Sequence, residues 1–242
     1  MRILLLLALL LVSFSAISND KKLAAEQTGI DPTEVIGRIE FNYSYVEKEI
    51  GTKRHSGVFR FDRDINDSTL IKVEVPIATA ELVDGGRENG LGDIGFSLAN
   101  RFYHSDSFSS MIGGAITLDT ATDPSLGESA NSLTLGTFNS FRVKPWLFSG
   151  ILFAKFSEES EDNRLTFAPL IGYQPMVEYL SYVPVGPSAS HYWERDDTFF
   201  GTVVSLGKVM KNGDVYSFGS RFSLDGESDD KLVINLGYRR LF

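Results

Sequence analysis

The chain has 242 residues, no cysteine and a formal net charge of −9. Without cysteine it has no disulfide framework, zinc–thiolate site or cysteine nucleophile. Lys and Arg are scattered through this acidic chain and form no basic stripe, so nucleic acid is a poor candidate partner.

The first 18 residues, MRILLLLALLLVSFSAIS, have the pattern of a secretory signal peptide. Arg2 supplies a positive charge, an apolar run follows from Ile3 to Val12, and small residues precede the expected cleavage before Asn19. A transmembrane helix needs about 20 apolar residues, and this run is shorter. We therefore expect an exported protein with a periplasmic N-terminal segment over 19–34 and one domain over 35–242.

Apolar and polar residues alternate with a period of two through most of the remaining chain, which predicts strands with one apolar face. Ile71, Val73 and Val75, for example, alternate with Lys72 and Glu74. We predict about twelve strands, with ten as the alternative, over residues 36–48, 55–63, 67–79, 91–103, 108–119, 131–142, 146–157, 163–174, 176–183, 197–210, 213–224 and 230–242.

Long and short connections alternate along this series. The long ones include 78–90, 119–131 and 184–197, the longest, whereas the short ones lie near 104–107, 143–145 and 174–175. Outer-membrane barrels have long external loops and short periplasmic turns. With twelve strands, both ends of the barrel domain fall on the periplasmic side.

Two all-β architectures fit the alternation. A soluble sandwich turns its apolar faces inward, whereas a membrane barrel turns them toward lipid. The signal peptide, the 12% aromatic content and the loop asymmetry favour the barrel. We therefore predict an all-β, transmembrane, up-and-down antiparallel β-barrel in the bacterial outer membrane, closed because lipid offers no partner to a free strand edge.

Charged residues on the polar faces of these strands are predicted to point into the lumen. Either they form a salt-bridged plug, since buried charges must be paired, or they line a narrow polar pathway. We expect the charges of the early strands to pair across the lumen. The predicted inward set is Arg38, Glu40, Arg60, Asp62, Lys72, Glu74, Asp93, Arg101, Lys155, Arg221 and Arg239.

The C-terminal residues VINLGYRRLF resemble the signal that the barrel insertion machinery of Gram-negative bacteria recognises. Asn235, Gly237, Tyr238 and the terminal Phe242 carry the resemblance. Arg240 departs from the pattern, which has a hydrophobic residue at that place. An aromatic ring at Phe242 suits the membrane interface. The alternative is a last soluble strand that ends on Phe.

Three motifs resemble the family labelled MetA-pathway of phenol degradation. They are Val75-Pro76 at a strand end, Gly90-Leu91-Gly92-Asp93 before the next strand, and the loop from Asp119 to Pro124. The loop departs from the family's Pro-Thr-Gly, because it contains Ala-Thr-Asp-Pro. The resemblance covers about residues 35–242 and implies an outer-membrane barrel that conducts small hydrophobic compounds.

Other motifs predict no catalytic or metal site. GLGDIG lacks the helix of a phosphate-binding loop. His191 has Ser188, Ser190, Asp196 and Asp197 nearby, but neighbours in one loop rarely form a triad, and there is no nucleophile elbow. Tyr192 and Trp193 fit contact with lipid headgroups or a ligand. The acidic runs SEESED and DGESDD lack the calcium-loop pattern, so we interpret them as solvated charge.

The leading prediction is a non-enzymatic channel or transporter for small hydrophobic compounds, without cofactor or metal. The alternatives are a non-conducting structural or surface-interaction barrel, and an outer-membrane lipid-modifying enzyme. Expected partners are outer-membrane lipid and lipopolysaccharide, the barrel insertion machinery and a small hydrophobic solute.

Overall fold

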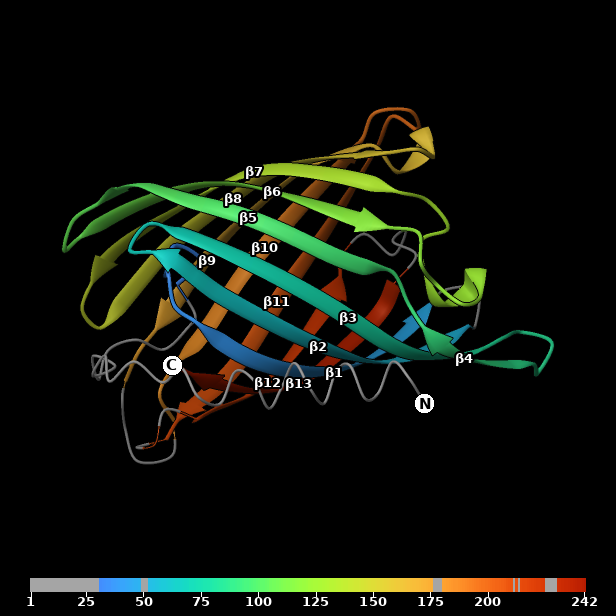
Figure 1. Ribbon diagram of the computed structural model, residues 1–242, viewed down its shortest axis with the longest axis horizontal. Coiled ribbons are helices and arrows are strands. Elements are labelled where there is room, and N and C mark those ends of the chain that lie inside the picture. Colours follow the sequence, from blue (N-terminus) through green and yellow to red (C-terminus); the bar gives the residue numbers. More distant parts are fainter. Residues whose placement is uncertain (1–30, 49–51, 176–179, 211, 213, 225–229) are drawn as a thin grey trace.

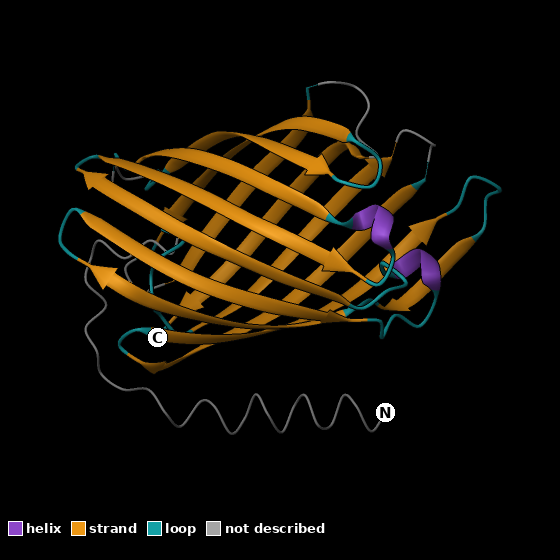
Figure 2. Cartoon of the chain, turned by 90° about the horizontal axis from the view of Figure 1, so that it is seen from above, coloured by secondary structure: helices purple, strands orange, loops and turns teal. Residues whose placement is uncertain are grey.

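A computed structural model describes residues 31–48, 52–175, 180–210, 212, 214–224 and 230–242. The predicted signal peptide, the segment 19–30 and most of the acidic run 225–230 lie outside these residues. Strands dominate the described chain, and two short 3₁₀ helices, η1 (Pro124–Leu126) and η2 (Ser160–Asp162), lie in its loops (Figure 2).

Twelve of the strands in the described part of the chain form a closed antiparallel barrel (Figure 1). The pairing of β1 with β13 and of β2 with β3 closes the ring. The fold class is therefore the predicted one. The barrel strands are β1 (Arg38–Lys48), β2 (Lys53–Asn66), β3 (Thr69–Glu81), β5 (Ile94–His104), β6 (Phe108–Leu118), β7 (Ser132–Val143), β8 (Trp146–Ser157), β9 (Arg164–Tyr173), β10 (Val183–Tyr192), β11 (Asp197–Val209), β12 (Asp214–Ser223) and β13 (Asp230–Leu241).

A further strand, β4 (Arg87–Leu91), pairs only with the far end of β3. Together β3 and β4 form a hairpin arm that extends beyond the barrel wall (Figure 1). The sequence predicted this stretch as an open loop. The hairpin forms because β3 continues two residues past its predicted end at Thr79, and Gly85 at its tip has φ +85°, a conformation that glycine adopts readily.

The barrel is apolar outside and polar inside. Large apolar side chains are exposed on the outer face, among them Phe96 (46%), Leu98 (55%) and Ile112 (54%). Charged side chains are enclosed, with Asp62 at 0% and Lys155 at 4% exposure. A soluble protein would expel such charges and bury such rings. The outer face is therefore a surface for hydrocarbon, as the sequence predicted.

Aromatic pairs lie at both ends of the outer face. Near the short turns, Trp146 contacts Tyr173 and Tyr216 contacts Tyr238, with ring centroids 4.8 and 5.3 Å apart. At the other end, Phe156 lies 5.6 Å from Trp193. Aromatic rings favour the boundary between lipid and water. We call the end with the short turns, where β1 begins and β13 ends, the periplasmic end.

A second predicted connection is also wrong. Residues 184–197, expected as the longest loop, mostly form β10, and the external connection after it is only 193–196. Pro187 lies in the middle of this strand, although proline cannot donate to a β ladder. The strand accommodates it because Pro169 of β9 occupies the place across from it, in a gap where no residues pair between Val185↔Ile171 and Ala189↔Phe167.

Candidate functional site

Seven of the predicted inward residues form one cluster on four neighbouring strands. The register places Arg38 opposite Asp62, Glu40 opposite both Arg60 and Arg239, Lys72 opposite Asp62 and Glu74 opposite Arg60. All occupy the face away from the exposed apolar side chains, toward the periplasmic half of the strands. We call this cluster the charged wall; its members are Arg38, Glu40, Arg60, Asp62, Lys72, Glu74 and Arg239.

Asp62 is the centre of the charged wall. Its carboxylate accepts hydrogen bonds from Nε of Arg38 at 2.6 Å and from Nε and Nη2 of Arg60 at 2.8 Å. Glu40, 4% exposed, lies 3.4 Å from Arg239 and 3.8 Å from Arg60. These pairs join adjacent strands along one side of the barrel. The expectation that they would pair across the lumen is therefore wrong, because cross-strand neighbours already neutralise one another.

The opposite side of the lumen is apolar. Met111 of β6 pairs with Phe138 of β7, which pairs with Ile151 of β8, and Phe153 lies two residues further along β8. These side chains share a face with the buried Ser140 and Ser149 rather than with the exposed Phe141 and Phe148. We call Met111, Phe138, Ile151 and Phe153 the apolar wall.

The sequence did not predict the apolar wall. In WLFSGILFAKF both faces carry apolar residues, so the period-two pattern is weak. The weak alternation itself indicates an apolar stretch of the lumen. An outer-membrane strand needs polar residues on its inner face only where that face meets water. The lumen therefore has one charged side and one apolar side.

An inward-folded loop over 119–131 narrows the external end of the barrel. Asp93 holds it, because its carboxylate accepts the backbone N–H groups of Thr120 at 3.1 Å, Ala121 at 3.0 Å and Glu128 at 2.5 Å. Leu126 at its centre is fully buried against Ala78 and Ala80 of β3. The GLGD motif thus ends in an anchor for this loop, a role that the sequence did not indicate.

Two barrel cations also hold the loop. Arg54 of β2 donates to the carbonyl oxygen of Leu126 at 2.5 Å, and Nζ of Lys155 on β8 lies 2.7 Å from the carboxylate of Glu128. β2 and β8 lie on different sides of the ring. Lys155 therefore acts at the external end and does not join the charged wall.

The N-terminal segment narrows the periplasmic end. Residues 31–36, which precede β1, extend across the barrel end as far as β7. There the carboxylate of Asp31 pairs with the guanidinium of Arg142 and accepts a hydrogen bond from Ser140 at 2.5 Å. Ile36 packs with Tyr182, Val215 and Leu241 in a small apolar cluster. Burial in this cluster raises the pKa of the Tyr182 phenol above its ordinary value.

The other predicted residues lie apart from these contacts. Arg101, near the periplasmic end of β5, donates to the carbonyl oxygen of Asp67 at 2.7 Å. Arg221 lies toward the other end of β12, opposite Val233, and is exposed. Of the expected insertion signal, Asn235, Gly237 and Tyr238 lie in β13; Phe242, just after it, stacks on Phe61 with centroids 6.3 Å apart.

The residues around His191 do not assemble a triad. In β10, Ser190 and His191 are consecutive and so point to opposite faces of the strand. Ser190 contacts Thr166 at 2.8 Å, whereas Nδ1 of His191 contacts the hydroxyl of Thr198 at 3.0 Å. Among the described residues, no group of three or more His, Asp or Glu side chains could hold a metal ion.

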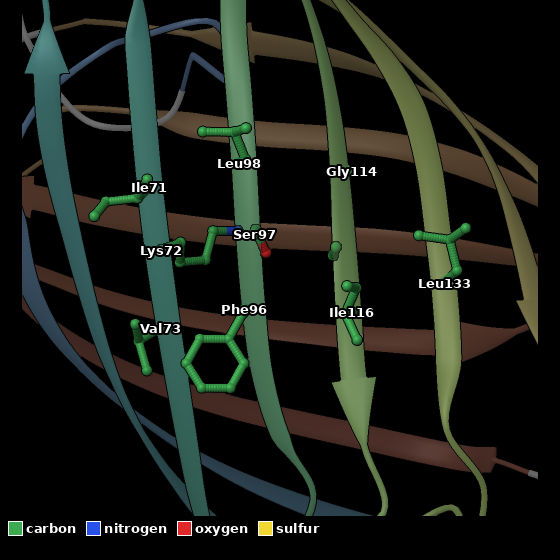
Figure 3. Close-up of a pocket in the computed structure, with 10 residues that line it drawn as sticks. Ile71, Lys72, Val73, Phe96, Ser97, Leu98, Gly114, Ile116 and Leu133 are labelled. Atoms are coloured by element: carbon green, nitrogen blue, oxygen red, sulfur yellow. The ribbon is translucent and has the colours of Figure 1, made fainter.

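A shallow apolar groove lies on the outer face over β3, β5, β6 and β7. Ile71, Phe96, Leu98 and Leu133 line it around Gly114, and Figure 3 shows it with the far wall of the barrel behind. Its position within the hydrocarbon-facing belt makes lipid its ordinary neighbour. Separately, no helix in the described part of the chain has the length and hydropathy to cross a membrane.

No protein-family model and no curated protein matches this sequence. Several solved structures do match this chain. The chain is similar to the COG4313 outer membrane channel from Pseudomonas putida F1, with a TM-score of 0.71, 13% identity and coverage of 91% of this chain and 100% of that one. It is also similar to the NanC porin (TM-score 0.60, 8% identity, 85% and 99% covered) and to the KdgM porin in complex with disordered oligogalacturonate (0.59, 8%, 85% and 99%).

Because the sequence identities are only 8–13%, the similarity to these structures shows a shared fold. The closed antiparallel barrel and its apolar outer belt agree with it, because only a closed barrel or a helix satisfies its backbone inside a membrane. The protein is a bacterial outer-membrane β-barrel.

Proposed function

We propose that this barrel is an outer-membrane channel for small hydrophobic compounds, of the type that the MetA-pathway motifs suggest. The observation that carries the proposal is the apolar wall, which offers an apolar solute a surface inside an otherwise polar lumen. Ligand sites combine apolar lining with a few placed polar groups, and here the charged wall supplies the polar side. The likeness in fold to an outer membrane channel agrees with this proposal.

The two inward segments favour a narrow pathway rather than an open pore. Residues 31–36 cross the periplasmic end, and the loop 119–131 covers part of the external end. A general diffusion porin would leave a wide aqueous channel. The same two segments suit the alternative of a non-conducting structural barrel, in which the charged wall only stabilises the fold.

Conductance in planar bilayers separates these two functions. We expect the mature protein to pass a small ion current that an uncharged apolar solute, such as hexanol, interrupts in proportion to its concentration. Phe153→Ser should weaken the interruption because it removes an apolar surface from the lumen. Phe148→Ser, on the outer face of the same strand, is the matched control and should leave it unchanged.

Absence of current from correctly folded protein would support the structural barrel. If hexanol interrupts the current equally in the wild type and in Phe153→Ser, the apolar wall does not contact the solute. The refolded state of each variant can be checked by its mobility in unheated gels.

A further inference from the structure

A carboxylate site is built into the periplasmic end of the lumen, and the chain itself fills it. Asp31, which is 5% exposed, places its carboxylate against Arg142 and Ser140 of β7. The guanidinium also donates to the hydroxyl of Thr33 at 3.3 Å. Asp31 precedes β1, and β7 lies five strand pairings away around the wall, so these residues meet only because 31–36 crosses the barrel.

Three serines form a row beside this carboxylate. Ser109, Ser140 and Ser149 are direct register partners on β6, β7 and β8, with exposures of 0%, 1% and 7%. Within the described residues, the hydroxyl of Ser149 has no hydrogen-bond partner. A buried hydroxyl without a partner is costly, so an oxygen-bearing ligand group in this place would recover that cost.

The apolar wall begins next to the serine row, on its side toward the external end of the barrel. Phe138 lies two residues from Ser140 along β7, and Ile151 lies two residues from Ser149 along β8. Phe153 continues the surface, and the next cation on β8 is Lys155, about 20 Å from Ser149 at roughly 3.3 Å per residue. An elongated apolar group therefore has a surface between the serine row and the external loop.

We propose that Arg142, Ser140 and Ser149 bind the carboxylate of an amphipathic solute whose apolar chain lies along Phe138, Ile151 and Phe153. Asp31 holds this place as an internal carboxylate until the solute displaces it. An arginine that pairs with a carboxylate forms charge-assisted hydrogen bonds, which are stronger than neutral ones. The proposal rests on the proposed channel function, and it specifies a carboxylate as the head group of the solute.

Binding of decanoate and decanol to the mature protein in nanodiscs tests the site. The two probes have the same chain length, and only decanoate carries a charge. Equilibrium dialysis against empty nanodiscs corrects for uptake by lipid. Asp31→Asn removes the competing charge, so it should strengthen decanoate binding by about tenfold or more. Decanol binding should not change.

Arg142→Gln, placed in the Asp31→Asn background, should remove this gain for decanoate alone. Lys144→Gln is the matched control, since it deletes a neighbouring exposed cation outside the site. Unheated gel mobility shows that each variant has folded. In the wild type, decanoate should also make the chain more susceptible to a protease that cuts after Asp31 or Glu34.

An unchanged decanoate affinity in Asp31→Asn, an equal gain for decanol, or a decanoate gain that survives Arg142→Gln would overturn the proposal and leave the Asp31 pair as a structural tie. That outcome leaves the channel proposal standing if hexanol still interrupts the current. Conversely, a barrel without current that prefers decanoate would retain the site and lose the channel.

Discussion

Removing the charge of Asp62 tests whether the charged wall is a set of coupled buried pairs. Asp62 is fully buried and accepts bonds from two arginines at 2.6 and 2.8 Å. Loss of one member of a buried pair costs about 3–5 kcal/mol. We expect Asp62→Asn to lie at the low end, about 3 kcal/mol, because Glu40 remains 3.6 Å from Arg38 and 3.8 Å from Arg60.

Urea unfolding in lipid vesicles, followed by tryptophan fluorescence, measures the free energy of unfolding. Glu74→Gln is the matched control, because Glu74 is 38% exposed and lies 3.8 Å from Arg60. Exposed pairs contribute about 0–1 kcal/mol, so its loss should be small. Equal free energies of unfolding for Asp62→Asn and the wild type, or equal losses for the two variants, would refute the reasoning.

Two other substitutions test the ends of the barrel. Asp93→Ala removes the acceptor of three backbone N–H groups, so limited proteolysis should cut within 119–131 faster. Asp123→Ala loses only two local bonds from Ser125 at the start of η1, so it should leave the rate of cutting nearly unchanged, and equal rates for the two variants would contradict the anchoring role of Asp93. Gly207→Ala places a Cβ against the ring of Tyr182, so it should displace the ring from Ile36, loosen the segment 31–36 and raise conductance. An unchanged conductance would show that this packing does not hold the segment across the periplasmic end.

The strands were predictable because membrane strands obey one local rule. Their outer residues must be apolar, and the period-two pattern follows from that requirement alone. The rule gives no prediction for strand segments whose outer residues do not face hydrocarbon. At β10 the small and polar residues from Gly186 to Ser190 and two prolines suggested a loop, and only the partner strand shows that Pro187 fits. β2 is longer than predicted, 53–66 rather than 55–63, because its ends carry polar residues beyond the hydrocarbon.

The site was predictable in composition and not in arrangement. Alternation selected the charged residues, and the up-and-down topology gives the neighbours of each strand. The register between neighbouring strands is not readable from the sequence, so the pairing along one wall was missed. The loop anchor Asp93 and the tie between Ser140 and Asp31 join residues 35 and 109 positions apart. No local pattern predicts such contacts, because they follow from closure of the whole barrel.

The orientation of the side chains is the central claim, and spin labels on β5 test it most directly. The chain has no cysteine, so single-cysteine variants need no background changes. Labels at Phe96 and Leu98 should collide with oxygen dissolved in lipid, whereas labels at Ser97 and Ala99 should be shielded from it and meet water-soluble nickel complexes instead. The reverse pattern, or no alternation between neighbouring positions, would contradict a barrel with its apolar face toward lipid.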